Sequence, residues 1–173
     1  MPFSYQGKLA SEEKKPATYS QSADTNLSNA VSTVDKLLQQ KGNIVLSMGQ
    51  DDTIGHAVQL LKDKGIGALV VASDEGELQG IISERDIVRR LADGSDGILD
   101  LPIGEIMTKD VVTCSPDDSM IKVLQIMTEG RFRHIPVVQN GMLVGLVTIG
   151  DMVNFRLKEL EYESLQMKQM IVG

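Results

Sequence analysis

The sequence contains the same unit twice, and this internal repeat constrains the fold more than any other feature of the chain. Segment 45–52, VLSMGQDD, matches segment 111–118, VVTCSPDD, so the two copies begin 66 residues apart. Further along, Gly80 matches Gly145 at an offset of 65 residues, which places a one-residue difference in the turn before them. Such a small unit exposes one apolar sheet face and can bury that face against its twin.

Each copy predicts the order strand, helix, hairpin, helix. Behind each strand, apolar residues recur with the i, i+3, i+4, i+7 spacing of one helix face. In the second copy, Ser115 and Asp118 occupy the N-cap and N3 positions expected where that helix starts. Gly76 and Gly141 mark turns between β-branched runs, which predicts hairpins of residues 68–71 with 78–82 and 134–138 with 143–147, followed by helices at 86–91 and 151–160. The apolar helix positions are Ile54, Ala57, Val58 and Leu61 in the first copy and Met120, Val123, Leu124 and Met127 in the second.

This order predicts an α+β fold in which two small sheets pack face to face about a pseudo-twofold axis, with flanking helices and two clefts between the repeats. The predicted organisation is a flexible N-terminal tail at 1–28, a first repeat with a leading helix at 29–100, a second repeat at 101–158 and a C-terminal helix at 159–173. Leu165 and Met167 lie among charged residues of that last helix, so we expect it to pack on the core or across the twofold axis of a homodimer.

Composition narrows the classes of partner. The chain has 17 Lys and Arg against 24 Asp and Glu, a formal net charge of −7, which argues against nucleic acid and anionic membranes. No run approaches the ~18 apolar residues that span a bilayer, and the first 30 residues lack the apolar block of a secretory signal. Cys114 is the single cysteine and cannot form an internal disulfide. These features predict a cytoplasmic protein.

Four segments carry a resemblance to a known family. Segments 80–86, GIISERD, and 145–151, GLVTIGD, share a glycine, two apolar residues, Ser or Thr, and a final Asp. With 131–138, RFRHIPVV, and 106–108, IMT, they resemble the CBS-domain (cystathionine-β-synthase-type) family over residues 30–158. The resemblance implies a tandem pair of regulatory repeats that binds AMP, ATP, NAD or S-adenosylmethionine and acts as an energy or metabolite sensor.

The chemistry of the two Asp residues can be argued independently. A carboxylate fixed at a helix start can accept hydrogen bonds from both hydroxyls of a ribose. The adjacent hydroxyl and the free N–H groups of the first helical turn favour a phosphate. Asp86 with Ser83, and Asp151 with Thr148, supply these groups. Each pair also satisfies the capping-box pattern, in which the carboxylate turns back to its own backbone.

In the family, the Asp of one repeat faces the first strand and hairpin entry of the other, which makes the two clefts unequal here. The resemblance places Arg133 and His134 on the phosphate in the first cleft, whereas Gly67 and Ala68 hold the matching positions in the second. We therefore expect the main nucleotide site beside Asp86, with the base against Val111, Val112 and Phe132. The predicted members of this cleft are Ile81, Ser83, Arg85, Asp86, Val111, Val112, Arg131, Phe132, Arg133, His134 and Pro136. The predicted members of the second, weaker cleft are Val45, Leu46, Ile66, Gly67, Ala68, Val70, Thr148 and Asp151.

The sequence thus predicts a non-catalytic regulatory module that binds an adenine nucleotide, AMP first, with ATP, ADP and NAD(H) as alternatives, and that signals to an effector protein. No metal site is expected, because Cys114 has no second ligand at metal spacing and the acidic loop 93–97 lacks the Glu of a calcium loop. Two other classes stay open. One is a ligand-free dimerisation adaptor, and the other is a nucleotide hydrolase, which the lack of a recognisable nucleophile and base disfavours.

Overall fold

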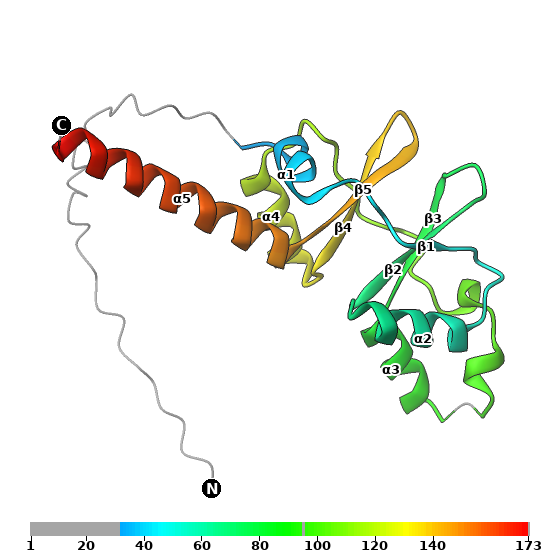
Figure 1. Ribbon diagram of the computed structural model, residues 1–173. Helices are drawn as coiled ribbons and strands as arrows, with labels where there is room; N and C mark the ends of the chain where they lie inside the picture. The colour runs from blue at the N-terminus through cyan, green and yellow to red at the C-terminus, as the bar shows by residue number, and fades with distance from the viewer. Residues whose placement is uncertain (1–31, 95, 173) are drawn as a thin grey trace, which may run out of the picture. The chain divides into compact units, whose positions relative to one another are not determined.

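The computed structural model describes residues 32–94 and 96–172, and it shows the two predicted repeats (Figure 1). The first repeat contains β1 (Ser47–Met48), α2 (Ile54–Lys64), β2 (Ala68–Ala72), β3 (Leu78–Ser83) and α3 (Glu84–Ala92). The second contains α4 (Met120–Gly130), β4 (His134–Gln139), β5 (Met142–Thr148) and α5 (Ile149–Val172), and α1 (Val34–Lys41) precedes both. Two short 3₁₀ turns, Ile98–Asp100 and Ile103–Glu105, lie between the repeats. The tail predicted at 1–28 lies outside the described residues.

Each repeat forms its own small sheet. β2 pairs in parallel with β1 and antiparallel with β3, and β4 pairs antiparallel with β5. The first strand predicted in each copy is shorter than expected, two residues in the first copy and a single parallel bridge between Cys114 and Val137 in the second. The hairpin turns of the two sheets meet where Leu143 N donates to Gly76 O at 3.2 Å. The α+β pair of small, helix-flanked sheets confirms the predicted fold class.

The helix starts differ from the prediction. α4 begins at Met120 with Ser119 as its N-cap, and Thr53 caps α2 in the same way. Ser115 and Asp118 instead close a turn that comes just before α4. In this turn, Ser115 N donates to Asp118 Oδ2 at 2.9 Å. Asp binds backbone N–H groups in turns as readily as at helix caps, so the pattern alone does not distinguish the two.

The repeated apolar helix faces are buried at three of their four positions. Val58 and Leu124, both at i+4, remain 36% and 37% exposed. The other members pack under their own sheets and form two separate cores, one per repeat. The buried positions are Ile54, Ala57 and Leu61 in α2 and Met120, Val123 and Met127 in α4.

The segments that lead into the two repeats are exchanged between the cores. Val34, Leu37 and Leu38 of α1 are buried in the core of the second repeat. Ile103 and Met107, which precede the second repeat in sequence, are buried in the core of the first. The predicted boundaries, which placed the leading helix with the first repeat and residues 101–108 with the second, therefore do not follow the packing.

The glycine that opens each repeated heptapeptide makes room for this exchange. A Cβ on Gly145 would lie 2.8 Å from Leu38 Cδ2. A Cβ on Gly80 would lie 2.9 Å from the carbonyl oxygen of Thr108. In the first repeat the close approach allows two backbone hydrogen bonds, Ile81 N to Thr108 O at 3.0 Å and Thr108 N to Ile81 O at 2.9 Å. The repeated glycine is therefore a packing requirement at the point where the other repeat's leading segment crosses the hairpin.

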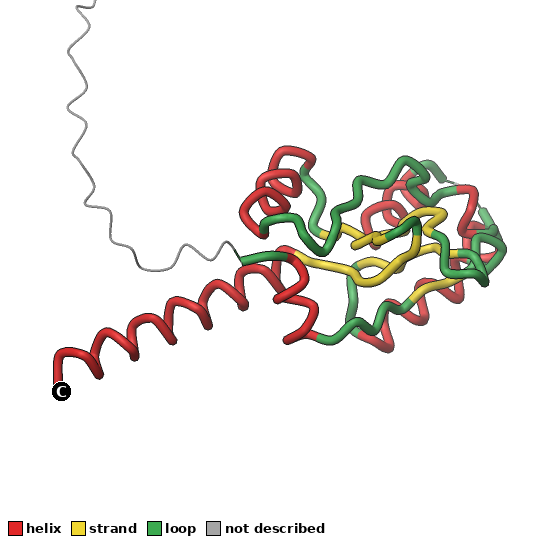
Figure 2. Tube along the Cα trace, turned by 90° about the horizontal axis from the view of Figure 1, so that it is seen from above, coloured by secondary structure: helices red, strands yellow, loops and turns green. Residues whose placement is uncertain are grey.

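α5 is a single continuous helix of 24 residues, so the predicted division between a helix at 151–160 and a separate one from 159 does not exist (Figure 2). Its first turns are anchored, because Met152 and Phe155 lie in the second core and Ser32 Oγ donates to Glu159. Leu160 and the residues after it extend beyond that core with most apolar side chains exposed. Within the described part of the chain, no helix is both long and apolar enough to span a bilayer.

The exchanged packing predicts that α1 is needed for the stability of the second repeat. Leu38 is 4% exposed, so Leu38→Ala should lower the free energy of unfolding by about 2–5 kcal/mol through lost burial and the cavity left behind. Urea denaturation measures this change. Lys36→Ala, on the exposed side of the same helix, is the control and should change stability by less than about 0.5 kcal/mol. Equal small effects of both substitutions would show that α1 does not pack as described.

Candidate functional site

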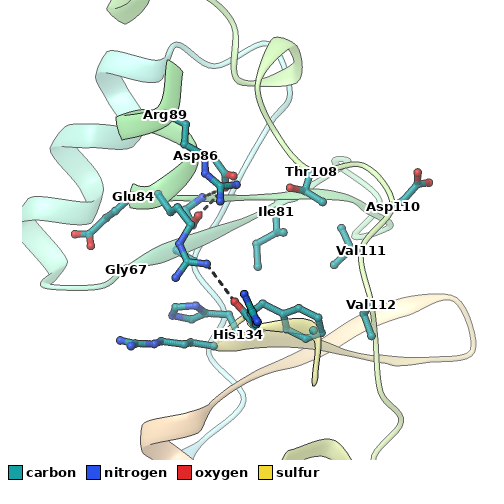
Figure 3. A pocket seen from close by; sticks show the side chains of 17 residues that line it. Gly67, Ile81, Glu84, Asp86, Arg89, Thr108, Asp110, Val111, Val112 and His134 are labelled. Carbon is teal, nitrogen blue, oxygen red and sulfur yellow. Dashed lines mark hydrogen bonds between the residues drawn. The ribbon is translucent and has the colours of Figure 1, made fainter. Parts of the chain in front are cut away.

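A cavity of about 780 Å³ lies between the two repeats, on the side of β3 and α3 (Figure 3). Its volume falls within the range of about 300–1,000 Å³ typical of small-molecule sites. In Figure 3, Asp86 and Arg89 lie on one side of the space, His134 on the opposite side, and Val111 and Val112 along a third. The walls thus come from both repeats, as predicted for the first cleft.

The structure brings together ten of the eleven residues predicted for this cleft. Pro136 is the exception, because it is buried in β4 and its carbonyl oxygen accepts a hydrogen bond from Cys114 N at 3.1 Å. Pro136 therefore contributes to the sheet and not to the cavity wall. The ten that line the cavity are Ile81, Ser83, Arg85, Asp86, Val111, Val112, Arg131, Phe132, Arg133 and His134.

Seven further lining residues were not predicted for this cleft. Gly67 and Ala68 had been placed in the second cleft, but the entries of both hairpins lie close together, and a Cβ on Gly67 would be 3.6 Å from His134 Cε1. Glu84 and Arg89 flank Asp86 on α3, and sequence reasoning could have included them from their helical positions. The additional lining residues are Gly67, Ala68, Glu84, Arg89, Thr108, Asp110 and Gly130.

Asp86 is held rigidly by its own helix start. Its Oδ2 accepts from Ser83 N at 2.9 Å and from Ser83 Oγ at 2.6 Å. The capping-box reading is therefore correct for this oxygen. The half-buried carboxylate nevertheless lines the cavity, and among the described residues no hydrogen bond occupies Oδ1. Capping and ligand binding are compatible here, because one oxygen fixes the side chain while the other can accept from a ligand.

The cavity concentrates positive charge in an acidic chain. Four arginines line it, against the three carboxylates of Glu84, Asp86 and Asp110, which leaves a formal charge of +1 with a neutral histidine, whereas the whole chain carries −7. Arg85 Nη1 donates to Arg131 O at 3.1 Å, which links the two repeats across the cavity. Guanidinium groups suit phosphate and carboxylate oxygens, so an anionic ligand group is favoured.

Arg131 has a backbone conformation that an arginine rarely adopts. It ends α4 with φ of 56° and ψ of 35°, in the left-handed region. The matching residue at the end of α2 is Gly65, with φ of 62° and ψ of 38°. Glycine adopts this conformation without strain, whereas other residues adopt it at a cost of about 1 kcal/mol. Arg131 thus holds a left-handed position that the matching repeat gives to glycine, and it lines the cavity.

Phe132 provides an apolar wall and depends on the glycine two residues before it. A Cβ on Gly130 would lie 2.1 Å from Phe132 Cε1, so the ring packs directly over the Gly130 backbone. Phe132 also packs against the core of the second repeat, which fixes its ring. With Ile81, Val111 and Val112, it makes one part of the cavity suitable for a flat apolar group such as a purine.

His134, at the start of β4, lines the Asp86 cavity. Burial lowers its pKa below the usual value of 6.5, with further lowering by the charges of Lys41 and Arg133 and opposing effects of Asp151 and Glu84. Lys41 belongs to α1, Asp151 to α5 and Glu84 to α3, and Arg133 directly precedes β4, so the electrostatic field of both acidic helix starts acts on the imidazole. At neutral pH the imidazole is therefore neutral and can serve as a hydrogen-bond donor or acceptor.

The Asp151 side of the molecule differs from the predicted second cleft. Lys41 at the end of α1 donates to Asp151 Oδ2 and, at 2.9 Å, to Leu146 O. Asp151 also accepts from Thr148 N at 3.0 Å with the same oxygen. Asp151 lines a small cavity of about 160 Å³ between α1 and α5. None of the other residues predicted for the second cleft lines this cavity. Those residues are Val45, Leu46, Ile66, Gly67, Ala68, Val70 and Thr148.

Neither a metal centre nor a reactive thiol is apparent in the described ranges. No group of three or more His, Cys, Asp or Glu side chains in residues 32–94 and 96–172 is arranged to hold a metal ion. Cys114 is buried, and burial, with a smaller effect of Asp118, raises the pKa of its thiol to about 12. A thiol with this pKa is almost wholly protonated at neutral pH and does not act as a nucleophile.

With this fold and cavity established, comparison with known proteins identifies the class. The CBS domain family matches residues 44–93 and 103–158, one copy for each repeat, and the chain belongs to this family. Pairs of CBS domains are in general regulatory modules without catalytic activity of their own.

Three relatives show how far the similarity extends. The CBS domain-containing protein CBSX3, mitochondrial, of Arabidopsis thaliana is 30% identical over 94% of this chain and 81% of its own length. The structure of the CBS-domain protein ATU1752 from Agrobacterium tumefaciens is 41% identical, with a TM-score of 0.69 over 72% of this chain and 99% of that one. The CBS domain pair of protein MJ0100, solved with 5-methylthioadenosine and S-adenosyl-L-methionine, is 26% identical, with a TM-score of 0.66 over 75% and 98% of the two chains.

The depressed pKa of His134 predicts a specific loss of stability in mild acid. The unfolded chain takes up a proton on this residue near its usual pKa of about 6.5, before the folded protein does. The free energy of unfolding should therefore be largest above that pH and should fall as the pH is lowered from about 7 to 5.5. His134→Gln should show a shallower fall over the same range, measured by urea denaturation at several pH values. Identical slopes in the two proteins would contradict the assignment to His134.

Proposed function

We propose that the chain binds an adenine nucleotide or related adenosyl ligand in the Asp86 cavity and transmits the bound state to an effector protein. AMP is the first candidate, followed by ATP, ADP and NAD(H). The observation that carries the proposal is a fixed carboxylate with a free oxygen, facing a cluster of arginines across a cavity of nucleotide size. The 5-methylthioadenosine and S-adenosyl-L-methionine of the MJ0100 pair support the adenosine part of the proposal.

The cavity suggests a pose in three parts. Asp86 Oδ1 accepts from the ribose hydroxyls, while Oδ2 stays bound to Ser83. The purine lies against Val111, Val112 and Phe132. The phosphate lies toward Arg131, Arg133 and His134, where charge-assisted hydrogen bonds are strongest.

Regulation follows from the fact that both repeats contribute to the cavity. A ligand that contacts α3 and β4 together stabilises one relative arrangement of the repeats, and the effector responds to that arrangement. The size of the signal is limited by the difference between the ligand's affinities for the two arrangements. A cytoplasmic location and a homodimer remain our expectations for the working state of the chain.

A thermal-shift panel with AMP, ADP, ATP, NADH, S-adenosylmethionine and methylthioadenosine tests the proposal. A ligand at 100 times its dissociation constant should stabilise the protein by about 2.7 kcal/mol. Asp86→Asn should abolish the shift, because the amide can no longer accept both ribose hydroxyls with the same oxygen geometry and charge. Asp151→Asn, the matched change in the other repeat, should leave it largely intact. Equal loss in both variants would overturn the choice of the Asp86 cavity.

Arg131 offers a second test, in which stability and binding should change in opposite directions. Arg131→Gly removes a left-handed arginine, so the free energy of unfolding without ligand should rise by up to about 1 kcal/mol. Loss of one charge-assisted contact should weaken the binding of a phosphorylated ligand by about tenfold or more. Denaturation and calorimetry on the same variant measure the two effects. A variant that binds normally would show that the Arg131 side chain does not contact the ligand.

Two other functions remain open to the same experiments. Absence of binding by every ligand in the panel at millimolar concentration would favour a structural adaptor that works through dimerisation. Product formed on long incubation with ATP, and abolished by Asp86→Asn, would favour a nucleotide hydrolase. The site offers little support for hydrolysis. The Ser83 hydroxyl donates to Asp86 Oδ2 at 2.6 Å, but this pair caps α3, and no histidine hydrogen-bonds to it among the described residues, so the set of nucleophile, base and orienting group is incomplete.

A further inference from the structure

One side of α5 carries an apolar stripe that faces away from the core of its own repeat. Met152, Phe155 and Glu159, which contact the rest of the molecule, lie on one side of the helix. The stripe lies on another side and has the alternating four- and three-residue spacing of a coiled-coil seam. Its members are Val153, Leu157, Leu160, Ser164, Met167 and Ile171, and the five apolar ones are 45% to 83% exposed.

We propose that this stripe, here called the α5 seam, is the surface on which a second copy of the chain docks, with the two α5 helices parallel and in register. The proposal extends the expected homodimer by naming its surface and orientation. Figure 1 shows why the seam is accessible, since α5 continues well past α1 and α4. A helix of 24 residues is about 36 Å long, and the seam runs along most of it.

The charged residues beside the seam favour an identical α5 helix, in the parallel direction, as its binding partner. In heptad terms, the seam residues are the a and d positions, and the residues that flank them are the g and e positions. In a parallel pair, each g residue faces the e residue that lies five positions further along the other helix. Arg156 then faces the partner's Glu161, and Glu163 faces the partner's Lys168. By symmetry each attraction occurs twice. An identical helix therefore complements α5 at all four of these charged flanking positions.

The antiparallel arrangement lacks this complementarity. In the register that overlaps the whole seam, Glu161 faces the partner's Glu161 and Glu163 faces the partner's Glu163. Like charges opposite one another oppose pairing. Within one chain, Arg156 bonds to Glu159 at 3.1 Å and lies 3.9 Å from Glu163, which also flanks the seam, and its side chain is 60% exposed.

Ser164 is the one polar residue within the seam. In a parallel pair it faces its own copy, where two short hydroxyl side chains fill the interface poorly and weaken the pair. Ser164→Ile should strengthen dimerisation at least tenfold, because a β-branched apolar residue at this position favours a two-stranded seam. Gln169→Ile, on another face of α5, is the control and should leave the dimer unchanged. Sedimentation equilibrium measures the dimer dissociation constant of the full chain, and an unchanged or weaker dimer of the Ser164 variant would contradict the seam.

The surface is tested by paired substitutions in the full chain. Leu160→Glu with Met167→Glu adds two charges to the seam, whereas Tyr162→Glu with Gln169→Glu adds the same charges on another face of α5. All four side chains are exposed, so folding should be unaffected. We expect the first variant to be monomeric and the second to remain dimeric. A dimeric seam variant would show that the copies meet elsewhere. A monomeric wild type would overturn both the homodimer and the seam. Neither outcome would count against the proposed nucleotide binding.

Disulfide trapping tests the orientation. Met167→Cys should form a 167–167 cross-link on mild oxidation if the helices are parallel and in register. Cross-linking only in the Leu157→Cys, Met167→Cys double variant would indicate antiparallel helices and overturn the proposed direction. The wild type is the control, because its one cysteine, Cys114, is buried with a pKa raised to about 12.

Discussion

The exchange of leading segments holds the two repeats in one unit. Each core is completed by side chains that precede the other repeat in sequence, Leu38 over Gly145 and Met107 over Gly80. Backbone hydrogen bonds follow the same crossed pattern, from Val34 N to Asp118 O at 3.0 Å and from Ile103 N to Asp52 O at 2.8 Å. A small repeat that could not bury its sheet alone is thereby closed by a segment from outside itself.

The cavity between the repeats is a consequence of that arrangement. Because the leading segments fix both hairpins, Asp86 at the start of α3 and Arg131 at the end of α4 face the same space from different repeats. Much of the site is built from atoms whose positions the fold already determines. Ser83 holds one oxygen of Asp86, and the Gly130 backbone supports the ring of Phe132. A site held this way loses little conformational freedom when a ligand binds.

The sequence predicted the elements that depend on local periodicity and turn chemistry. The hairpins around Gly76 and Gly141 and the faces of α2 and α4 follow from such patterns, and ten members of the cavity could be named from the repeat and the family resemblance. The contact between Lys41 and Asp151 could not, because it joins residues 110 positions apart and depends on where α1 packs. The continuity of α5 was also missed, since no residue near 158 either breaks or requires a helix.

Lys41 makes the surroundings of the two acidic helix starts different. The ammonium group of Lys41 pairs with Asp151 at the start of α5, whereas Asp86 at the start of α3 faces the cavity. The repeat containing Asp151 therefore carries α5 next to a paired carboxylate, and the repeat containing Asp86 keeps its carboxylate in the wall of the cavity. Two segments of similar sequence thus form acidic helix starts with different surroundings, one closed by an ion pair and one facing the cavity.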